Sequence, residues 1–321
     1  MNTDFKPRII FRDPVFDGAA DPTVIRRVSD GKLFMFYTQR RATIDCPADS
    51  VEWCYGTKIG AAVCDETVCV RHHEGEARRI PLQKQTAGEG GVSLDAPGMK
   101  EDGGFDKWEY IGALDLGFGG NATFWAPEVV FDGESYRMFV TYIDGVFSEW
   151  AGEASIEQYI SPDLLQWRRV GRVEIESARV IDPCLFPLPA GGWRMWYKDE
   201  KRGSRTCFCD TEDFESWRSG GFATDETAQE GPNVFALGGY FWLVADVWDG
   251  LAVYRSDDLT RFVRQRGNIL PGIASHADVF CEGETARLVY FTYPEGDRRS
   301  AVCECGLTVK NGVLRVEGDI E

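Results

Sequence analysis

The chain has 321 residues, of which 43% are hydrophobic and 13% aromatic, and its formal net charge at pH 7 is −17. This length is enough to bury a large core. So strong a negative charge disfavours nucleic acid and anionic membranes, and we expect neither as a partner. The stretch MNTDFKPRII lacks the apolar segment of an export signal, and no apolar run approaches the roughly 20 residues of a membrane-spanning helix. We therefore expect a cytoplasmic protein.

Ten cysteines occur in the chain, and without an export signal they favour reduced thiols over disulfides. Cys207 and Cys209 are two residues apart, as are Cys303 and Cys305, so each pair shares one face of a strand. Zinc sites use wider spacings. We expect no required cofactor from this pattern.

The chain begins with a lone predicted strand, RIIFRDPVFD at residues 8–17, which precedes the first of several repeats. In each repeat an apolar strand begins beside an acidic residue, a turn follows, and a second strand rich in aromatic residues returns. The five copies are DPTVIRRVSDGKLFMFYT, APEVVFDGESYRMFVTY, DPCLFPLPAGGWRMWYK, EGPNVFALGGYFWLVAD and HADVFCEGETARLVYFTY, with leading acids Asp21, Glu128, Asp182, Glu230 and Asp278. From Glu128 onward these acids follow at intervals of 54, 48 and 48 residues, whereas Asp21 precedes Glu128 by 107. The first copy therefore carries an insertion, which we place at about 71–104.

A second element recurs between the copies, with a polar turn, an apolar anchor and then an aromatic residue. Its examples are SPDLLQWRRVG (161–171), DTEDFESWRSG (210–220), SDDLTRFVRQ (256–265) and, more loosely, DGGFDKWEYIG (102–112). The pattern indicates a hairpin whose turn is fixed by aspartate. The two elements together give about four strands per unit of roughly 50 residues. The sequence therefore predicts an all-β protein, a single five-bladed β-propeller over residues 1–321, with the lone strand added to the last blade.

The leading acids begin the strands that would line the central channel of a propeller. We therefore expect them to meet at one end of the axis, beside His276. Carboxylates brought together repel one another, which raises the pKa of at least one of them. A protonated and an ionised carboxyl across a small cavity are the equipment for glycoside hydrolysis.

At these motifs the sequence resembles glycoside hydrolase family 43 and its five-bladed relatives in families 117 and 130. The resemblance rests on ADPTVI (20–25), FWAPEVV (124–130), IDPCLF (181–186), EGPNVF (230–235) and SHADV (275–279). It implies that Asp21 is the general base, that Asp182 orients the acid and tunes its pKa, and that Glu230 is the general acid. It also implies that His276 lies on the axis, near a calcium ion or a bound water. The insertion has no counterpart in the resemblance.

Four further residues are candidates for substrate binding. Glu128 and Asp278 would bind sugar hydroxyls, although acids at strand starts also hold ordinary turns. Trp125 and Trp248 would stack on a sugar face, although most of the ten tryptophans must be hairpin anchors or core residues.

The function that these features predict is an inverting, exo-acting glycosidase for small oligosaccharides, such as arabinosides or xylosides. One alternative is a glycoside phosphorylase, which would need two or more cationic side chains at the axis, where the motif starts are acidic. Another is a propeller that binds carbohydrate without catalysis, which would have no need for three axial carboxylates. The sequence indicates neither the sugar nor an oligomeric state.

Overall fold

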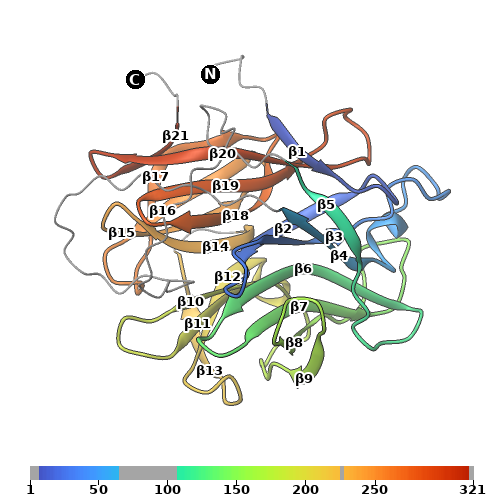
Figure 1. Ribbon diagram of the computed structural model, residues 1–321, viewed down its shortest axis with the longest axis horizontal. Coiled ribbons are helices and arrows are strands. Elements are labelled where there is room, and N and C mark those ends of the chain that lie inside the picture. The colour runs from blue at the N-terminus through green and yellow to red at the C-terminus, as the bar shows by residue number, and fades with distance from the viewer. Residues whose placement is uncertain (1–6, 65–106, 225–227, 318–321) are drawn as a thin grey trace.

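The computed structural model describes residues 7–64, 107–224 and 228–317, so the proposed insertion at 71–104 lies outside the described residues. In the described ranges, five antiparallel sheets surround a common centre as the blades of a β-propeller (Figure 1). Blade 1 contains β2 (Ala19–Arg26), β3 (Leu33–Gln39), β4 (Lys58–Cys64) and β5 (Glu109–Ala113), and blade 2 contains β6 (Ala122–Phe131), β7 (Tyr136–Asp144), β8 (Ser155–Ser161) and β9 (Arg168–Arg172). The predicted fold class is confirmed.

The other three blades repeat this order from the axis outward. Blade 3 contains β10 (Val180–Pro187), β11 (Trp193–Asp199), β12 (Arg205–Thr211) and β13 (Arg218–Phe222), and blade 4 contains β14 (Glu230–Leu237), β15 (Tyr240–Asp246), β16 (Gly250–Ser256) and β17 (Val263–Pro271). Blade 5 contains β18 (Ser275–Glu282), β19 (Thr285–Thr292), β20 (Ala301–Lys310), β21 (Val313–Val316) and the N-terminal β1 (Arg8–Arg12). Two short 3-10 helices, η1 (Glu52–Cys54) and η2 (Glu200–Arg202), lie between strands.

The lone N-terminal strand closes the ring, as predicted from its position before the first repeat. β1 pairs with one half of β20, at residues 301–304, and β21 pairs with the other half, at residues 307–310. The first and last described strands, β1 and β21, therefore share the outer position of blade 5 (Figure 1).

The polar turns between the outer strands of blades 2, 3 and 4 have the predicted construction. Asp163 accepts hydrogen bonds from the backbone N–H groups of Leu165 and Gln166 in blade 2. Asp213 accepts equivalent bonds from Glu215 and Ser216 in blade 3. The apolar anchor in each turn is buried and has a positive φ, of 67° at Leu164, 61° at Phe214 and 66° at Leu259. Hydrophobic side chains between neighbouring blades form the core clusters. Residues 102–106 of the looser fourth turn lie outside the described part.

The innermost strands share a bulge near their first residues. The pairing register with the second strand shifts there in all five blades. The bulged residues have φ values of 48°, 46°, 57°, 54° and 31°, and they are Asp21, Ala126, Asp182, Gly231 and His276. Proline follows the first four of them, and Ala277 follows His276. Because bulges re-aim side chains, these five positions are where the fold directs residues toward the end of the axis.

A ring of buried polar side chains lies two residues beyond the bulges and joins neighbouring blades. Glu128 accepts a hydrogen bond from the backbone N–H of Leu185 at 3.0 Å, and Asp278 accepts one from Val24 at 2.8 Å. The other members with such contacts are Thr23, Cys184 and Asn233. Since Asp278 also accepts from the Asn233 amide at 2.8 Å, it joins the last blade to both the fourth and the first.

Removal of the Asp278 carboxylate should destabilise the propeller strongly. Asp278→Ala removes the carboxylate that accepts hydrogen bonds from two buried donors, the N–H of Val24 and the amide of Asn233. This change should lower the free energy of unfolding by about 2–5 kcal/mol. Urea denaturation measures this change, with exposed Asp257→Ala as a control expected to stay within about 0.5 kcal/mol. Equal urea midpoints for Asp278→Ala and Asp257→Ala would show that the ring of buried polar side chains does not hold the blades together.

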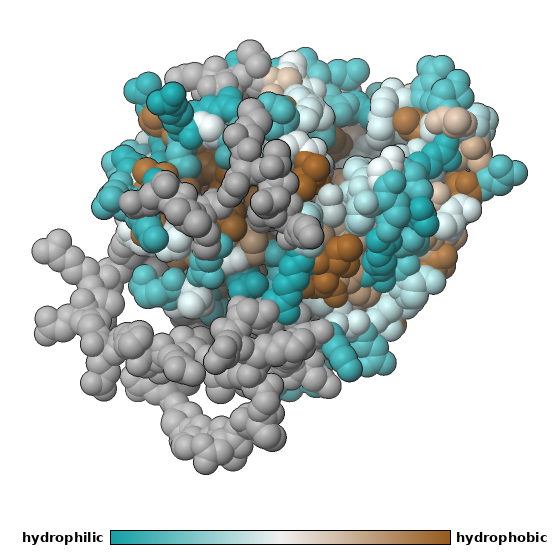
Figure 2. All heavy atoms as spheres, turned by 90° about the horizontal axis from the view of Figure 1, so that it is seen from above, coloured by the Kyte–Doolittle hydropathy of each residue, from teal (hydrophilic) through white to brown (hydrophobic). Residues whose placement is uncertain are grey.

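On the face that Figure 2 shows, the described surface is mainly hydrophilic. In Figure 2 hydrophobic residues appear on one face in small separate groups, apart from the atoms drawn in grey. The described residues contain no helix that is both long and apolar enough to cross a membrane.

Candidate active site

A cavity of about 480 Å³ lies at the end of the axis where the innermost strands begin. It is lined by residues at or next to the bulges of these strands, by residues at or just beyond the ends of the second strands, and by loops of blades 1, 2 and 4. Its lining residues are Asp21, Arg40, Cys54, Trp125, Trp150, Ile181, Asp182, Lys198, Glu200, Glu230, Asp246, Trp248, Ser275, His276, Phe291 and Tyr293. The three carboxylates predicted as catalytic, Asp21, Asp182 and Glu230, are therefore brought together from blades 1, 3 and 4.

Asp21 is buried at the bulge of β2 and is held by two basic side chains. The Arg40 guanidinium donates to both carboxylate oxygens, at 3.2 and 3.4 Å, and Nδ1 of His276 lies 3.5 Å from Oδ1. Arg40 also donates to the Tyr293 hydroxyl at 2.7 Å. Burial by itself lowers the pKa of Arg40, but the charge of Asp21 and the Tyr293 hydroxyl outweigh it and the pKa is raised. The Asp21 carboxylate thus has a fixed orientation beside a permanent positive charge.

Asp182 occupies the equivalent bulge of β10, between the other two acids. Its backbone N–H donates to the Thr141 hydroxyl at 3.1 Å, and its carboxylate accepts from the N–H of Gly231 at 3.1 Å. Gly231 directly follows Glu230, so this bond ties Asp182 to the backbone that carries the third acid. A side chain at Gly231 would meet the His276 ring at 2.6 Å, which explains why glycine stands there.

Glu230 is the most exposed of the three acids, with a side-chain exposure of 31%. It precedes the bulge of β14 by one residue, and Oε2 accepts from Nζ of Lys198 at 2.8 Å. Lys198 also lies 3.3 Å from Glu200, which pairs with Arg179. Burial lowers the pKa of Lys198, but Glu230 and Asp182 outweigh it and the pKa is raised. The ammonium therefore stays charged and fixes Glu230 at the cavity wall.

The raised pKa that the sequence predicts is found at Asp182. Burial is the largest cause and raises its pKa to about 6, His276 and Lys198 act in the opposite direction, and Glu230 and Asp21 reinforce the rise. Like-charge repulsion, the expected cause, is thus secondary to burial. The carboxyl of Asp182 holds a proton at pH values where an exposed aspartate has lost it.

This shift predicts an unusual pH dependence of stability. Because Asp182 binds its proton more tightly in the folded protein than in the unfolded chain, its contribution to stability is full at about pH 4 and is lost as the pH rises through about 6. Asparagine cannot ionise, so at pH 7.5 the free energy of unfolding of Asp182→Asn should exceed that of wild type by on the order of 1–3 kcal/mol. The variant should therefore melt at a higher temperature than wild type at pH 7.5 and at the same temperature near pH 4.

Asp30→Asn supplies a control of opposite sign for these melting curves. The Arg27 guanidinium lowers the pKa of Asp30, so this variant should be less stable than wild type at neutral pH and equal to it at low pH. If Asp182→Asn were less stable than wild type at both pH values, the proton on Asp182 would have no part in stability.

Two predicted substrate-binding residues do not reach the cavity. Glu128 and Asp278 are only 2% exposed and belong to the ring between the blades. The leading acids of the repeats occupy three different positions. Glu230 precedes the bulge and Asp21 and Asp182 occupy it. Glu128 and Asp278 lie two residues beyond it. Because side chains alternate along a strand and a bulge adds one residue, an offset of two residues moves a carboxylate from the cavity to the blade interface.

The predicted aromatic residues do line the cavity, together with one that the sequence analysis did not select. Trp125 is nearly buried and donates from Nε1 to the carbonyl of Cys54 at 2.6 Å, so its ring packs within the wall. Trp248 is 55% exposed. Trp150 is 64% exposed and lies with its ring centroid 6.0 Å from that of Trp125.

Sequence reasoning also missed the polar residues at the ends of the second strands. Arg40 follows β3, Lys198 lies near the end of β11, Asp246 ends β15 and Tyr293 follows β19. A polar residue placed directly after an aromatic strand, as in FYTQR and WYKDE, was the available signal. The motif starts are acidic, as the sequence shows, but three basic side chains, Arg40, Lys198 and His276, also line the cavity.

A calcium ion near His276, which the family resemblance implies, stays a prediction. Among the described residues, no group of three or more His, Cys, Asp or Glu side chains is arranged to hold a metal ion. Nδ1 of His276 instead faces the carboxylate of Asp21.

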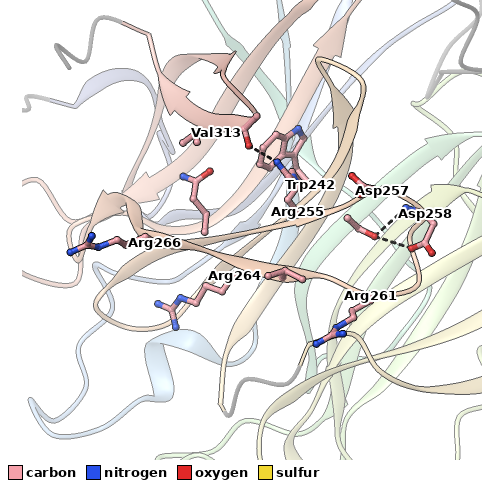
Figure 3. A pocket seen from close by; sticks show the side chains of 12 residues that line it. Trp242, Arg255, Asp257, Asp258, Arg261, Arg264, Arg266 and Val313 are labelled. Carbon is pink, nitrogen blue, oxygen red and sulfur yellow. Dashed lines mark hydrogen bonds between the residues drawn. The ribbon is translucent and has the colours of Figure 1, made fainter.

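A second cavity, of about 530 Å³, lies at the outer edge of blades 4 and 5, against β16, β17 and the turn before β21. Its arginines do not converge on one point (Figure 3). Arg255 donates to the carbonyl of Gly312 at 2.9 Å, and Asp258 fixes the β16–β17 turn. Arg264 and Arg266 lie on the outer strand β17, where basic residues disfavour pairing of the sheet edge with other chains.

Comparison with known proteins finds similarity in structure and not in sequence. No protein-family profile and no curated protein sequence matches the chain. A thermostable family-43 glycoside hydrolase superposes with a TM-score of 0.65 at 17% identity, over 96% of each chain. A family-43 β-xylosidase/α-arabinofuranosidase from a compost metagenome, in complex with xylotriose, gives 0.64 at 13% identity, over 97% of this chain and 98% of that one.

A family-32 β-fructofuranosidase from Bombyx mori gives a TM-score of 0.67 at 11% identity, over 99% of this chain and 66% of its own. The fold is thus shared by enzymes of more than one glycosidase family. The chain has the five-bladed β-propeller fold of the family-43 glycoside hydrolases.

Proposed function

We propose that the protein is an inverting glycoside hydrolase that removes a terminal sugar from short oligosaccharides. The observation that carries this proposal is the meeting of Asp21, Asp182 and Glu230 in one cavity, each in a different environment. A propeller that only binds sugar has no need for three axial carboxylates in three different environments. The cavity volume of about 480 Å³ is in the range of sites for small ligands, which supports a short substrate over a polymer.

The mechanism follows from the positions of the three acids. Asp21, oriented by Arg40 and His276, takes a proton from a water that attacks the anomeric carbon. The bond from that carbon to the glycosidic oxygen breaks, and Glu230 gives its proton to the departing oxygen. Asp182 holds the backbone next to Glu230 through the N–H of Gly231. The products are a sugar of inverted configuration and a free hydroxyl on the leaving group.

The substrate class is proposed from the structural relatives. One of them is named a β-xylosidase/α-arabinofuranosidase, and another is a β-1,3-galactosidase. The test is a screen of 4-nitrophenyl α-L-arabinofuranoside, β-D-xylopyranoside and β-D-galactopyranoside at several pH values. Proton NMR of the first product formed should show the anomer opposite to that of the substrate. Retained configuration would overturn the inverting mechanism, and saturable binding with no product would favour a non-catalytic propeller.

A glycoside phosphorylase is a second candidate, because Arg40, Lys198 and His276 line the cavity. Phosphate in place of water would need such cations. Each of them already lies beside a carboxylate, Arg40 and His276 at Asp21 and Lys198 at Glu230, which favours the hydrolase. Running the same screen with and without inorganic phosphate separates the two candidates, since a phosphorylase turns over only when phosphate is present.

A further inference from the structure

We propose that Trp248 is the aromatic platform of the leaving-group subsite, where it stacks on the sugar ring that departs. This inference rests on the proposed function and extends it, because it specifies a leaving group that is itself a sugar. It comes from the position of Trp248 relative to Glu230, from its exposure and from the backbone conformation in which it is held.

Trp248 lies on the side of the cavity that carries the proton donor. Glu230 and Asp246 are directly paired in the β14–β15 ladder, and Trp248 is two residues beyond Asp246. Lys198 connects the two side chains: its Nζ lies 2.8 Å from the Glu230 carboxylate and 5.7 Å from the centre of the Trp248 ring. A general acid must face the departing oxygen. The indole beside it therefore faces the group attached to that oxygen.

The exposure of Trp248 distinguishes it from other tryptophans. All ten tryptophans of the chain lie in the described residues, and only Trp150 and Trp248 are among the exposed large hydrophobic side chains. Both line this cavity. Trp150 packs on Tyr55 and Trp125. Trp248 has no ring contact of this kind among the described residues, and the cation of Lys198 lies over its ring. An exposed indole face in a sugar site is suited to the C–H face of a pyranose or furanose.

The backbone holds Trp248 in a conformation that a bulky residue rarely adopts. Its φ is 61°, in the left-handed region, where a residue with a side chain is strained. The buried carboxylate of Asp246 accepts from the N–H of Trp248 at 2.7 Å and fixes the turn. Gly250 closes it, since a Cβ there would lie 2.1 Å from the carbonyl oxygen of Leu270. Glycine would relieve the strain at position 248, so stability does not explain the tryptophan.

The test compares Trp248→Gly with wild type on two substrates that differ only in the leaving group. The leaving group of xylobiose is a sugar, whereas that of β-D-xylosyl fluoride is a fluoride ion. If the screen favours galactose or arabinose, the pair is β-1,3-galactobiose with β-D-galactosyl fluoride, or arabinobiose with α-L-arabinofuranosyl fluoride. The variant should lose about 10–100-fold in kcat/KM on the disaccharide and stay within about 3-fold on the fluoride. Its melting temperature should equal or exceed that of wild type, because the left-handed strain is gone.

Two further variants complete the experiment. Trp248→Phe keeps an aromatic face and should recover most of the disaccharide activity, whereas Phe222→Ala removes an exposed aromatic residue of the outer strand β13 and should match wild type on both substrates. Equal losses by Trp248→Gly on disaccharide and fluoride, or no loss on either, would overturn the leaving-group assignment. A wild-type enzyme inactive on all three substrate pairs would instead overturn the proposed function.

Discussion

Asp21→Asn should abolish hydrolysis of every substrate, whatever its leaving group, with a loss on the order of 10⁴-fold in kcat. The amide keeps the size and one acceptor oxygen of the carboxylate, and it still lies beside Arg40 and His276. It cannot take a proton from water. Since the attacking water must lose its proton in every turnover, a better leaving group gives this variant no help.

Azide provides the internal control for this variant. It is a nucleophile that needs no deprotonation, so adding it to Asp21→Asn should restore turnover and yield a glycosyl azide detectable by mass spectrometry. Asp257→Asn, a substitution of an exposed acid on the β16–β17 turn, should leave activity unchanged. An Asp21→Asn enzyme that retains a tenth or more of wild-type activity would show that another group is the base.

The repeats made the architecture predictable because each blade carries the same local signals. Alternating apolar strands, paired turn residues and the aspartate turns such as that at Asp163 act over a few residues, and all of them are visible in the sequence. The lone strand at the N-terminus could be assigned to the last blade because a ring of antiparallel sheets must close. The same reasoning located the cavity at the start of the innermost strands.

The composition of the site was less predictable, because it depends on offsets of one or two residues. The five bulges decide which side chain enters the cavity, and their left-handed residues include Ala126 and Gly231 as well as two acids. An acid near the start of a strand therefore has no fixed direction until the bulge is located. Glu128 shows this, since it resembles Asp21 in the repeat and lies instead between the blades.

Charge balance at the site was also outside the reach of the repeat pattern. Arg40 meets Asp21 across the bulged β2–β3 hairpin of blade 1, whereas Lys198 of blade 3 meets Glu230 through the packing of blade 3 against blade 4. Their presence changes the electrostatics from a group of repelling carboxylates to a set of paired charges, with burial as the main cause of the raised pKa at Asp182. The spacing of residues along the sequence does not show how deeply one carboxyl group is buried.

Glu230→Gln should separate the two catalytic roles, because its defect depends on the leaving group. An ordinary sugar leaving group departs as a poor anion and needs a proton, so the variant should lose roughly 10²–10⁴-fold in kcat on a disaccharide. A 2,4-dinitrophenyl glycoside departs as a stable anion, and on this substrate the variant should recover most of the loss. The glutamine still accepts a hydrogen bond from Lys198, so the cavity wall stays in place.

Comparing how the activities of Glu230→Gln and Asp21→Asn depend on the leaving group tests whether Glu230 is the acid. Glu200→Gln serves as the matched control, since Glu200 also lies beside Lys198 and lines the cavity but precedes no bulge of an innermost strand. Its activity ratio between dinitrophenyl glycoside and disaccharide should equal that of wild type, whereas the ratio for Glu230→Gln should rise by about the factor lost on the disaccharide. If Glu230→Gln were equally inactive on both substrates, Glu230 would not be the acid. If Asp21→Asn were the variant that recovered, the roles of the two carboxylates would be reversed, with the proton donor on blade 1 and the base on blade 4.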